Sequence, residues 1–173
     1  MKKALFIDRD GVINKEYDYV HKIEEFEFID GVFEALRKAR ELGYLLIVIT
    51  NQSGIGRGYY SEDDFFKLTE WMVEAFDDNG VHIDRVYHCP HAPGTGCDCR
   101  KPETGMIDRA LNDFAIDLKH SWLIGDKESD IQAAVKAGIA NHILVRSGHK
   151  IDETKTAAKH VCDTLKDAVE LLG

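Results

Sequence analysis

The sequence has 173 residues, of which 44% are hydrophobic and 31% are charged, a composition that fits one soluble globular domain. Its formal net charge is −9, which excludes the basic surface of a general nucleic-acid binder, because such proteins neutralise phosphates with Lys and Arg. No apolar run approaches the roughly 20 residues needed to cross a bilayer, and the run after the N-terminal lysines is too short for a signal peptide. We therefore expect a cytoplasmic protein without nucleic-acid or membrane partners.

Apolar runs typical of buried strands alternate with helix-like patterns along the chain. Strands are expected at residues 4–8, 44–50, 83–89, 121–125 and 142–145. Helices are expected at 31–42, from a capping box at Ser61 and Asp64 through Phe76, at 107–114, through Ile131 to a stop at Gly138, and at 164–172. This alternation predicts an α/β fold with a mainly parallel sheet between two helical layers, a three-layer sandwich. Without an internal repeat or a low-complexity linker, a single domain over 1–173 is the expected organisation.

Polar residues lie beyond the ends of the first four expected strands. They are Asp8 and Asp10, Thr50, Lys101, and Asp126 with Asp130. One aspartate after a strand is usually a turn or helix-cap residue, but here acids, a hydroxyl and a lysine recur from strand to strand. Because ligands of open parallel sheets bind beyond the carboxyl ends of the strands, these side chains should converge at one edge. Such a set is typical of phosphoryl transfer.

The chemistry of these residue types supports that interpretation. Clustered carboxylates repel one another and repel phosphate, so they need a divalent cation, and Mg²⁺ prefers oxygen ligands. One carboxylate can then attack phosphorus while the metal offsets the charge on the phosphoryl oxygens. A second acid two residues on can protonate the leaving alkoxide and later deprotonate water. Thr50 and Lys101 would donate to the phosphoryl oxygens.

Residues 54–58, GIGRG, invite comparison with a dinucleotide-binding fingerprint. That fingerprint would need glycine at position 59, which is Tyr59, and should follow the first strand rather than the second. We interpret the segment instead as a mobile loop beside the substrate. Its glycines permit a close approach, and Arg57 could meet a phosphate or a sugar.

Three of the four cysteines and a histidine lie close together in the segment 89–102. Cys89, His91, Cys97 and Cys99 would form a closed Cys₃His set of the kind that holds structural Zn²⁺, although the spacing is tighter than in common zinc fingers. Free thiols this close in a surface loop would be prone to oxidation, and disulfides are rare in cytoplasmic proteins. Cys162 stands alone and is interpreted as a small buried apolar residue.

Four segments resemble the motifs of the haloacid dehalogenase superfamily: DRDGV at 8–12, TNQSG at 50–54, RKP at 100–102 and GDKESD at 125–130. Together with FEFIDGV, the CPH…CDCRKP segment and LVRSG, they resemble the histidinol-phosphate/heptose-bisphosphate phosphatase family over most of the chain. The resemblance implies a Rossmann-like sheet and a Mg²⁺-dependent phosphatase. Because only about 20 residues separate Asp10 from the first expected helix, we expect no large cap domain and specificity from short loops.

The resemblance also implies a role for each matching residue. Asp8 would be the nucleophile that forms an aspartyl-phosphate, Asp10 the general acid/base, and Thr50 and Lys101 the phosphoryl-stabilising groups. The implied Mg²⁺ ligands are Asp8, the backbone carbonyl of Asp10 and Asp126, with Asp130 in a supporting position. The residues expected to bind or border the substrate are Arg9, Glu16, Tyr17, Asp18, Tyr19, Asn51, Gln52, Ser53, Arg57, Arg100 and Lys127. Zn²⁺ at Cys89, His91, Cys97 and Cys99 would fix the loop so that Arg100 and Lys101 face the substrate.

The resemblance leads to a specific function, with two alternatives kept open. The leading hypothesis is removal of the C7 phosphate of a heptose 1,7-bisphosphate, giving heptose 1-phosphate for nucleotide-activated heptose and lipopolysaccharide synthesis, by a monomeric enzyme. Histidinol phosphate is the rival substrate, but the extra cations Arg57, Arg100 and Lys127 suit a second phosphate better than a cationic amine. An inactive zinc-ribbon binding module for RNA or protein is the alternative of a different class. The acidic charge and the intact set of polar residues argue against it.

Overall fold

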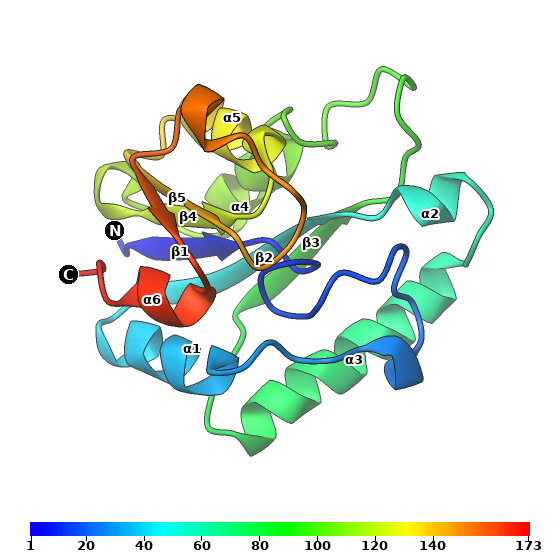
Figure 1. Ribbon diagram of the computed structural model, residues 1–173, viewed down its shortest axis with the longest axis horizontal. Helices are drawn as coiled ribbons and strands as arrows, with labels where there is room; N and C mark the ends of the chain where they lie inside the picture. Colours follow the sequence, from blue (N-terminus) through cyan, green and yellow to red (C-terminus); the bar gives the residue numbers. More distant parts are fainter.

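The computed structural model describes residues 1–173, which fold around a six-stranded sheet (Figure 1). The strands are β1 (Ala4–Ile7), β2 (Leu45–Asn51), β3 (Arg85–Cys89), β4 (Trp122–Gly125), β5 (Asn141–Val145) and β6 (His160–Cys162). Their order is β3-β2-β1-β4-β5-β6, and every neighbouring pair is parallel. β1 is buried throughout and β2 nearly so, which is why both appear in the sequence as continuous apolar runs.

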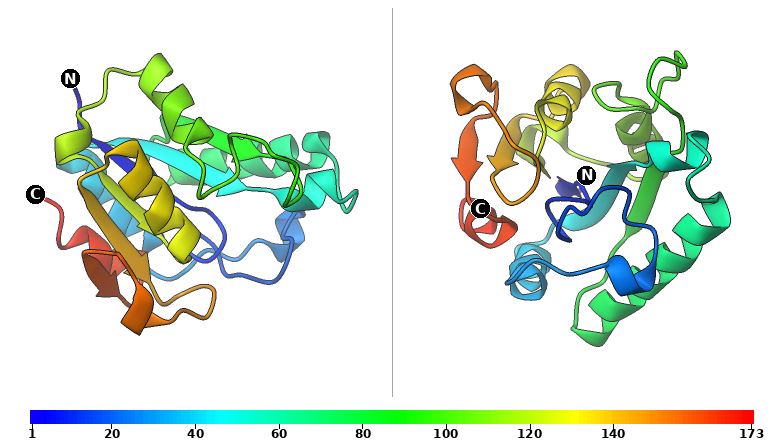
Figure 2. Two further views of the ribbon diagram at one scale, coloured as in Figure 1. Left: turned by 90° about the horizontal axis from the view of Figure 1, so that it is seen from above. Right: turned by 45° about the vertical axis from the view of Figure 1, so that its right-hand side comes forward.

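Helices cover both faces of the sheet (Figure 2). They are α1 (Val32–Glu41), α2 (Ser53–Gly56), α3 (Glu62–Asp78), α4 (Gly105–Asp113), α5 (Glu128–Ala137) and α6 (Leu165–Val169), with 3-10 turns at Ile23–Glu25, Leu118–His120 and Glu153–Lys155. Because side chains alternate along a strand, Leu5 and Ile7 join a core with α1, α3 and α6 on one face. Ala4 and Phe6 join a second core with α4 and α5 on the other.

The predicted three-layer α/β fold with a parallel sheet is therefore confirmed. The predicted capping box is present, since the Asp64 amide donates to Ser61 Oγ at 3.1 Å and the Ser61 amide donates to Asp64 Oδ2 at 3.0 Å. Gly138 ends α5 with φ +84°, as its position suggested. β6 and α2 were not predicted, because elements of three and four residues are too short to show a period.

The segment between β1 and α1 forms no cap domain, as expected. It contains one 3-10 turn and otherwise runs as a loop beside the carboxyl ends of the strands (Figure 1). Asp18 and Tyr19 both have positive φ, +58° and +55°, which turns the loop sharply at this point. None of the helices combines the length and apolar character that a membrane crossing needs.

Candidate active site

A polar cavity of about 290 Å³ opens at the carboxyl ends of the central strands. It is lined by Asp8, Asp10, Glu16, Asp18, Tyr19, Asn51, Gln52, Ser53, Arg57, Tyr60, Arg100, Lys101, Lys127, Ser129, Asp130 and His149. The loop after β1, the end of β2, the loops after β3, β4 and β5 and the start of α5 all contribute to this lining. The structure thus brings together most of the residues that the sequence singled out, from segments far apart in the chain.

Lys101 forms the centre of a buried cluster of charges at the floor of the cavity. Its Nζ lies 2.9 Å from Asp8 Oδ1 and 2.6 Å from Asp130 Oδ1, and it donates to the Ile49 carbonyl at 2.9 Å. Burial works to lower the pKa of Lys101, but the neighbouring carboxylates of Asp130 and Asp8 outweigh it and hold that pKa above its ordinary value. Burial also raises the pKa of Asp8 to about 7, with Lys101 acting in the opposite direction. Lys101 therefore stays charged against both carboxylates.

Asn51 holds the backbone of this lysine in place. The Lys101 amide donates to Asn51 Oδ1 at 3.0 Å, and Asn51 Nδ2 donates to the Lys101 carbonyl at 3.3 Å. Asn51 is the last residue of β2, so the end of one strand fixes the loop that follows another. Although Asn51 lines the cavity, its side chain is occupied by this contact.

Three aspartates of this cluster could hold a cation. Carboxylate oxygens of Asp8, Asp126 and Asp130 lie within 4.8 Å of one another, and all three side chains are buried. Asp130 Oδ2 accepts the backbone amides of Asp126 and Lys127 at 3.1 Å each, while its Oδ1 meets Lys101. Asp126 Oδ1 is buried without a hydrogen-bond partner. An orphaned carboxylate oxygen among acids is the environment that a hard cation such as Mg²⁺ fits.

The loop after β5 fixes the other oxygen of Asp126. His149 donates its backbone amide to Asp126 Oδ2 at 2.9 Å, and its ring Nδ1 lies 2.6 Å from the same oxygen. This hydrogen bond to Asp126 raises the pKa of His149. A Cβ added at Gly148 or Gly11 would come within 2.1 or 2.2 Å of Asp126 Oδ2, so glycine is needed on both sides. The arrangement leaves Oδ1 as the free oxygen of Asp126.

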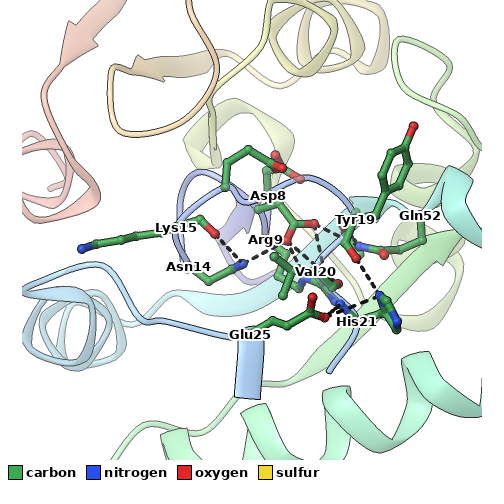
Figure 3. A network of polar contacts seen from close by, with 12 residues as sticks. Asp8, Arg9, Asn14, Lys15, Tyr19, Val20, His21, Glu25 and Gln52 are labelled. Carbon is green, nitrogen blue, oxygen red and sulfur yellow. Dashed lines mark hydrogen bonds and ion pairs between the residues drawn. The ribbon is translucent and has the colours of Figure 1, made fainter. Parts of the chain in front are cut away.

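Asp10 is held by three side chains in the network drawn in Figure 3. Arg9 Nη2 and Asn14 Nδ2 each donate to Asp10 Oδ1 at 2.9 Å, and Gln52 Nε2 donates to Asp10 Oδ2 at 3.2 Å. Gln52 Nε2 also donates to Thr50 Oγ1 at 2.8 Å, which connects the acid after β1 with the hydroxyl in β2. Asp10 therefore sits in the cavity wall with a fixed carboxylate.

Two residues expected to border the substrate lie elsewhere. Arg9 is only 1% exposed and does not line the cavity, because it turns inward behind Asp10. Tyr17 is 53% exposed and points away, donating its hydroxyl to Glu27 at 2.9 Å. The direction of a loop side chain depends on local backbone angles that the motif does not reveal. Neither residue lines the cavity.

Sequence reasoning missed Ser129 and His149 among the lining residues. Ser129 belongs to the motif at 125–130. Tyr60, which follows the glycine-rich loop and was considered as a sugar contact, does line the cavity. His149 follows β5 by only a few residues, so the rule that ligands gather at strand ends also applies to it.

The cysteine cluster folds as a second candidate metal site next to the cavity. Ligand atoms of Cys89, His91, Cys97 and Cys99 lie within 4.8 Å of one another. Cys89 Sγ is 3.7 Å from Cys97 Sγ, close to the spacing of about 3.8 Å that two thiolates on one tetrahedral zinc would have. Burial works to raise the pKa of Cys97, but hydrogen bonds from the Arg100 backbone and the Thr95 side chain outweigh it and lower that pKa to about 6. The donor set fits Zn²⁺.

Comparison with known proteins identifies the class. Residues 98–168 match the HAD-hydrolase-like family model. The D-glycero-β-D-manno-heptose-1,7-bisphosphate 7-phosphatase of Pasteurella multocida is 47% identical, covering 99% of this chain and 97% of that protein. The D-glycero-α-D-manno-heptose-1,7-bisphosphate 7-phosphatase of Campylobacter jejuni is 53% identical, covering 86% of this chain and 85% of that protein. The D,D-heptose 1,7-bisphosphate phosphatase of B. bronchiseptica, solved with magnesium and phosphate, aligns with a TM-score of 0.86 at 30% identity, covering 97% and 96% of the two chains.

The fold, the cavity and these matches define a phosphatase of the haloacid dehalogenase superfamily, a phosphoric monoester hydrolase. Within that superfamily, the chain belongs to the family of D-glycero-D-manno-heptose-1,7-bisphosphate 7-phosphatases. The family resemblance found from the motifs is thereby confirmed.

Proposed function

We propose that this enzyme removes the C7 phosphate of a D-glycero-D-manno-heptose 1,7-bisphosphate and releases heptose 1-phosphate and inorganic phosphate. The observation that carries the proposal is the buried Lys101 between Asp8 and Asp130 on the floor of a cavity that Asp10 also lines. In our proposal Asp8 is the nucleophile, Asp10 the acid and Lys101 the fixed cation around one phosphoryl group, and their arrangement supports this. The relatives named for this activity match nearly the whole chain.

The proposed reaction has two steps. A carboxylate oxygen of Asp8 attacks phosphorus, the bond to the C7 oxygen breaks, and Asp10 gives its proton to that oxygen. Asp10 then takes a proton from the water that attacks the aspartyl-phosphate, which frees phosphate and restores Asp8. Thr50 and Lys101 donate to the phosphoryl oxygens throughout, from positions fixed by Gln52 and Asn51.

Magnesium is the cofactor that this site fits. We propose that Asp8, the Asp10 carbonyl and Asp126 hold it, with Asp130 in support because both Asp130 oxygens are already occupied. When bound, Mg²⁺ would offset the charge of the clustered carboxylates and of the phosphoryl oxygens. The unpartnered Oδ1 of Asp126 supports this assignment.

Cations on the cavity wall suit a substrate with a second phosphate. Arg57, Arg100 and Lys127 all line the cavity, and we propose that they face the C1 phosphate. Glu16 and Asp18 lie on the same wall and can accept hydrogen bonds from sugar hydroxyls. The relatives include enzymes named for the α and for the β anomer, so the anomer is decided by experiment.

We propose that Zn²⁺ at Cys89, His91, Cys97 and Cys99 has a structural role. The cluster lies immediately before Arg100 and Lys101, and the ligand atoms are close enough for one ion. Zinc would fix the end of the loop 89–102 and so the direction of both cations. We still predict that the enzyme is a cytoplasmic monomer that supplies heptose 1-phosphate for lipopolysaccharide synthesis. We also predict that it contacts neither nucleic acid nor membrane.

The test is phosphate release with Mg²⁺ from the α- and β-heptose 1,7-bisphosphates and from histidinol phosphate, compared by kcat/KM. Phosphorus NMR of the products identifies which phosphate was removed. We expect C7 release from one heptose anomer at the highest kcat/KM and no turnover by Asp8→Asn. A higher kcat/KM for histidinol phosphate would overturn the proposed substrate. No turnover of any phosphomonoester would leave the inactive zinc-ribbon module as the better account.

A further inference from the structure

Arg9 lies between the two motif aspartates in sequence but outside the cavity in space. Its guanidinium carbon is 5.8 Å from the Phe26 ring centroid and 5.9 Å from that of Phe65, and the side chain is buried. A buried charge is strongly unfavourable unless it is paired. The anion that pairs with it is Asp10, at 2.9 Å from Nη2 to Oδ1, 3.1 Å from Nη2 to Oδ2 and 3.3 Å from Nε to Oδ1.

The hydrogen bonds are uneven between the two oxygens of Asp10. Oδ1 receives the shortest contacts, 2.9 Å from Arg9 and 2.9 Å from Asn14. Oδ2 receives only longer ones, 3.1 Å from Arg9 and 3.2 Å from Gln52. Oδ1 accepts from Arg9 and Asn14, whereas Oδ2 accepts from Arg9 and from Gln52, which itself lines the cavity, so we assign proton transfer to Oδ2.

Arg9 also connects Asp10 to the rim of the cavity. Its Nη2 donates to the Val20 carbonyl at 2.8 Å, in the loop that carries Glu16, Asp18 and Tyr19 to the cavity wall. In Figure 3, Arg9 lies between Asp8 and the segment of Val20 and His21. Arg9 Nη1 is buried without a hydrogen-bond partner, which is unfavourable. We attribute the buried position of the Arg9 side chain to the hydrogen bonds that it donates to Asp10 and to the Val20 carbonyl.

We propose that Arg9 is a positioning residue for Asp10 and not a substrate-binding residue. Its guanidinium holds the Asp10 carboxylate where Oδ2 can exchange a proton with the C7 oxygen and with water, and ties that position to the rim loop. Proton transfer needs the two heavy atoms about 2.6–3.2 Å apart, so a rotated or displaced Asp10 would lose efficiency. The inference rests on the proposed phosphatase reaction, in which Asp10 is the acid and base.

The leaving group distinguishes positioning of Asp10 from a structural role. A sugar alkoxide is a poor leaving group and needs the proton that Asp10 supplies, whereas 4-nitrophenolate leaves without it. Attack of water on the aspartyl-phosphate needs Asp10 for both substrates. Misplacing Asp10 should therefore slow phosphorylation of Asp8 by the sugar bisphosphate while leaving phosphorylation by 4-nitrophenyl phosphate intact.

The experiment compares Arg9→Lys and Arg9→Gln with wild type in rapid-mixing assays on both substrates. Lysine keeps the charge but cannot reproduce the forked contacts of the guanidinium. We expect single turnover of the sugar bisphosphate to slow by roughly 100-fold, within the range of general acid–base catalysis, with KM changed only a few-fold. The 4-nitrophenol burst should keep its wild-type rate, followed by a slower steady state. Arg40→Lys is the matched control, because Arg40 pairs with Asp84 away from the cavity.

Three outcomes would overturn the inference. A large rise in KM with kcat unchanged would make Arg9 a substrate-binding residue. An equal loss of burst rate with both substrates would make its role structural, as would unfolding of both variants while Arg40→Lys remains folded. Failure of the proposed function looks different, because wild type itself would then release no phosphate from the heptose bisphosphate. If wild type accepts another alkyl phosphate, that substrate takes its place in the comparison.

Discussion

At the scale of single residues, Lys101 shows how a charge can be buried at low cost. It is 5% exposed, yet two carboxylates and a backbone carbonyl accept from its Nζ. Each partner is itself largely buried, so solvent screens these interactions less than it screens surface ion pairs. Removing the lysine would leave Asp8 and Asp130 facing one another without a countercharge.

Lys101→Met should therefore reduce both stability and turnover. We expect the free energy of unfolding to fall by about 3–5 kcal/mol in urea titrations without Mg²⁺. We expect kcat to fall at least 100-fold, since a donor to the phosphoryl oxygens is lost. Lys136→Met is the control: its pair with Glu103 is half-exposed, so a change within about 0.5 kcal/mol and normal turnover are expected. Unchanged kcat in Lys101→Met would remove Lys101 from the reaction.

How much of the site was visible in the sequence also depends on single residues. The sequence predicted that three residues lie at the active site: Asp8, Asp10 and Lys101. This was possible because parallel strands bring the residues at their carboxyl ends to one edge of the sheet, whatever the conformations of the side chains. Arg9 could not be placed, because whether it faces the cavity or the core depends on the turn after β1. His149 could have been found by following β5 to its end, since its neighbours Ser147 and Gly148 mark a tight loop.

At the scale of elements, fully buried strands were predicted well and short edge elements were not. β1 and β2 are surrounded by core on both faces, so their sequences are apolar throughout. β6 pairs with β5 alone and has only three residues, so its conformation comes from that pairing and not from its composition. α6 ends at Val169, short of the predicted 172, although Leu172 still packs in the core.

The loop 89–102 carries the proposed zinc ligands, so we expect its shape to depend on the metal. Cys97→Ser should lower the zinc content below one ion per chain and lower the melting temperature, because structural zinc binding contributes directly to folding. We expect turnover to fall as well, since Arg100 and Lys101 follow the cluster directly. Cys162→Ser should keep both zinc and activity, because Cys162 lies in β6, away from the cluster. The zinc assignment is wrong if protein purified without chelator contains no zinc by elemental analysis.

At the scale of the whole molecule, the charge distribution separates the active site from the rest of the surface. The chain carries a formal net charge of −9, yet the cavity wall gathers Arg57, Arg100 and Lys127. An acidic protein repels a bisphosphate at long range, and these cations offset part of that repulsion beside the carboxylates that also line the cavity. This distribution of charge favours a substrate whose second phosphate can contact these cations.

The stability of the whole molecule should depend on pH through Asp8. Its pKa is raised from 3.8 to about 7 in the folded protein by burial. Between these pH values the folded protein without magnesium keeps a proton that the unfolded chain has lost, so its stability falls as pH rises through this window. Mg²⁺ competes with that proton, so the rise in melting temperature on adding Mg²⁺ should be larger at about pH 8 than at about pH 5.5.

Thermal melts of protein dialysed into magnesium-free buffer, with and without added Mg²⁺, measure this effect. Asp8→Asn has no such proton to lose and should show a smaller dependence of the Mg²⁺ effect on pH. An Mg²⁺ effect of equal size at both pH values in wild type would show that Asp8 is not the titrating ligand.

The contact of Lys101 with both Asp8 and Asp130 has a consequence for the lifetime of the enzyme between substrates. Because an ammonium group already pairs with two of these carboxylates, we expect the fold to persist when magnesium is absent. Magnesium should then bind and dissociate reversibly, so that a chain without magnesium is inactive but still folded. Turnover should resume as soon as magnesium is restored, whereas loss of the proposed zinc should require the loop 89–102 to refold first.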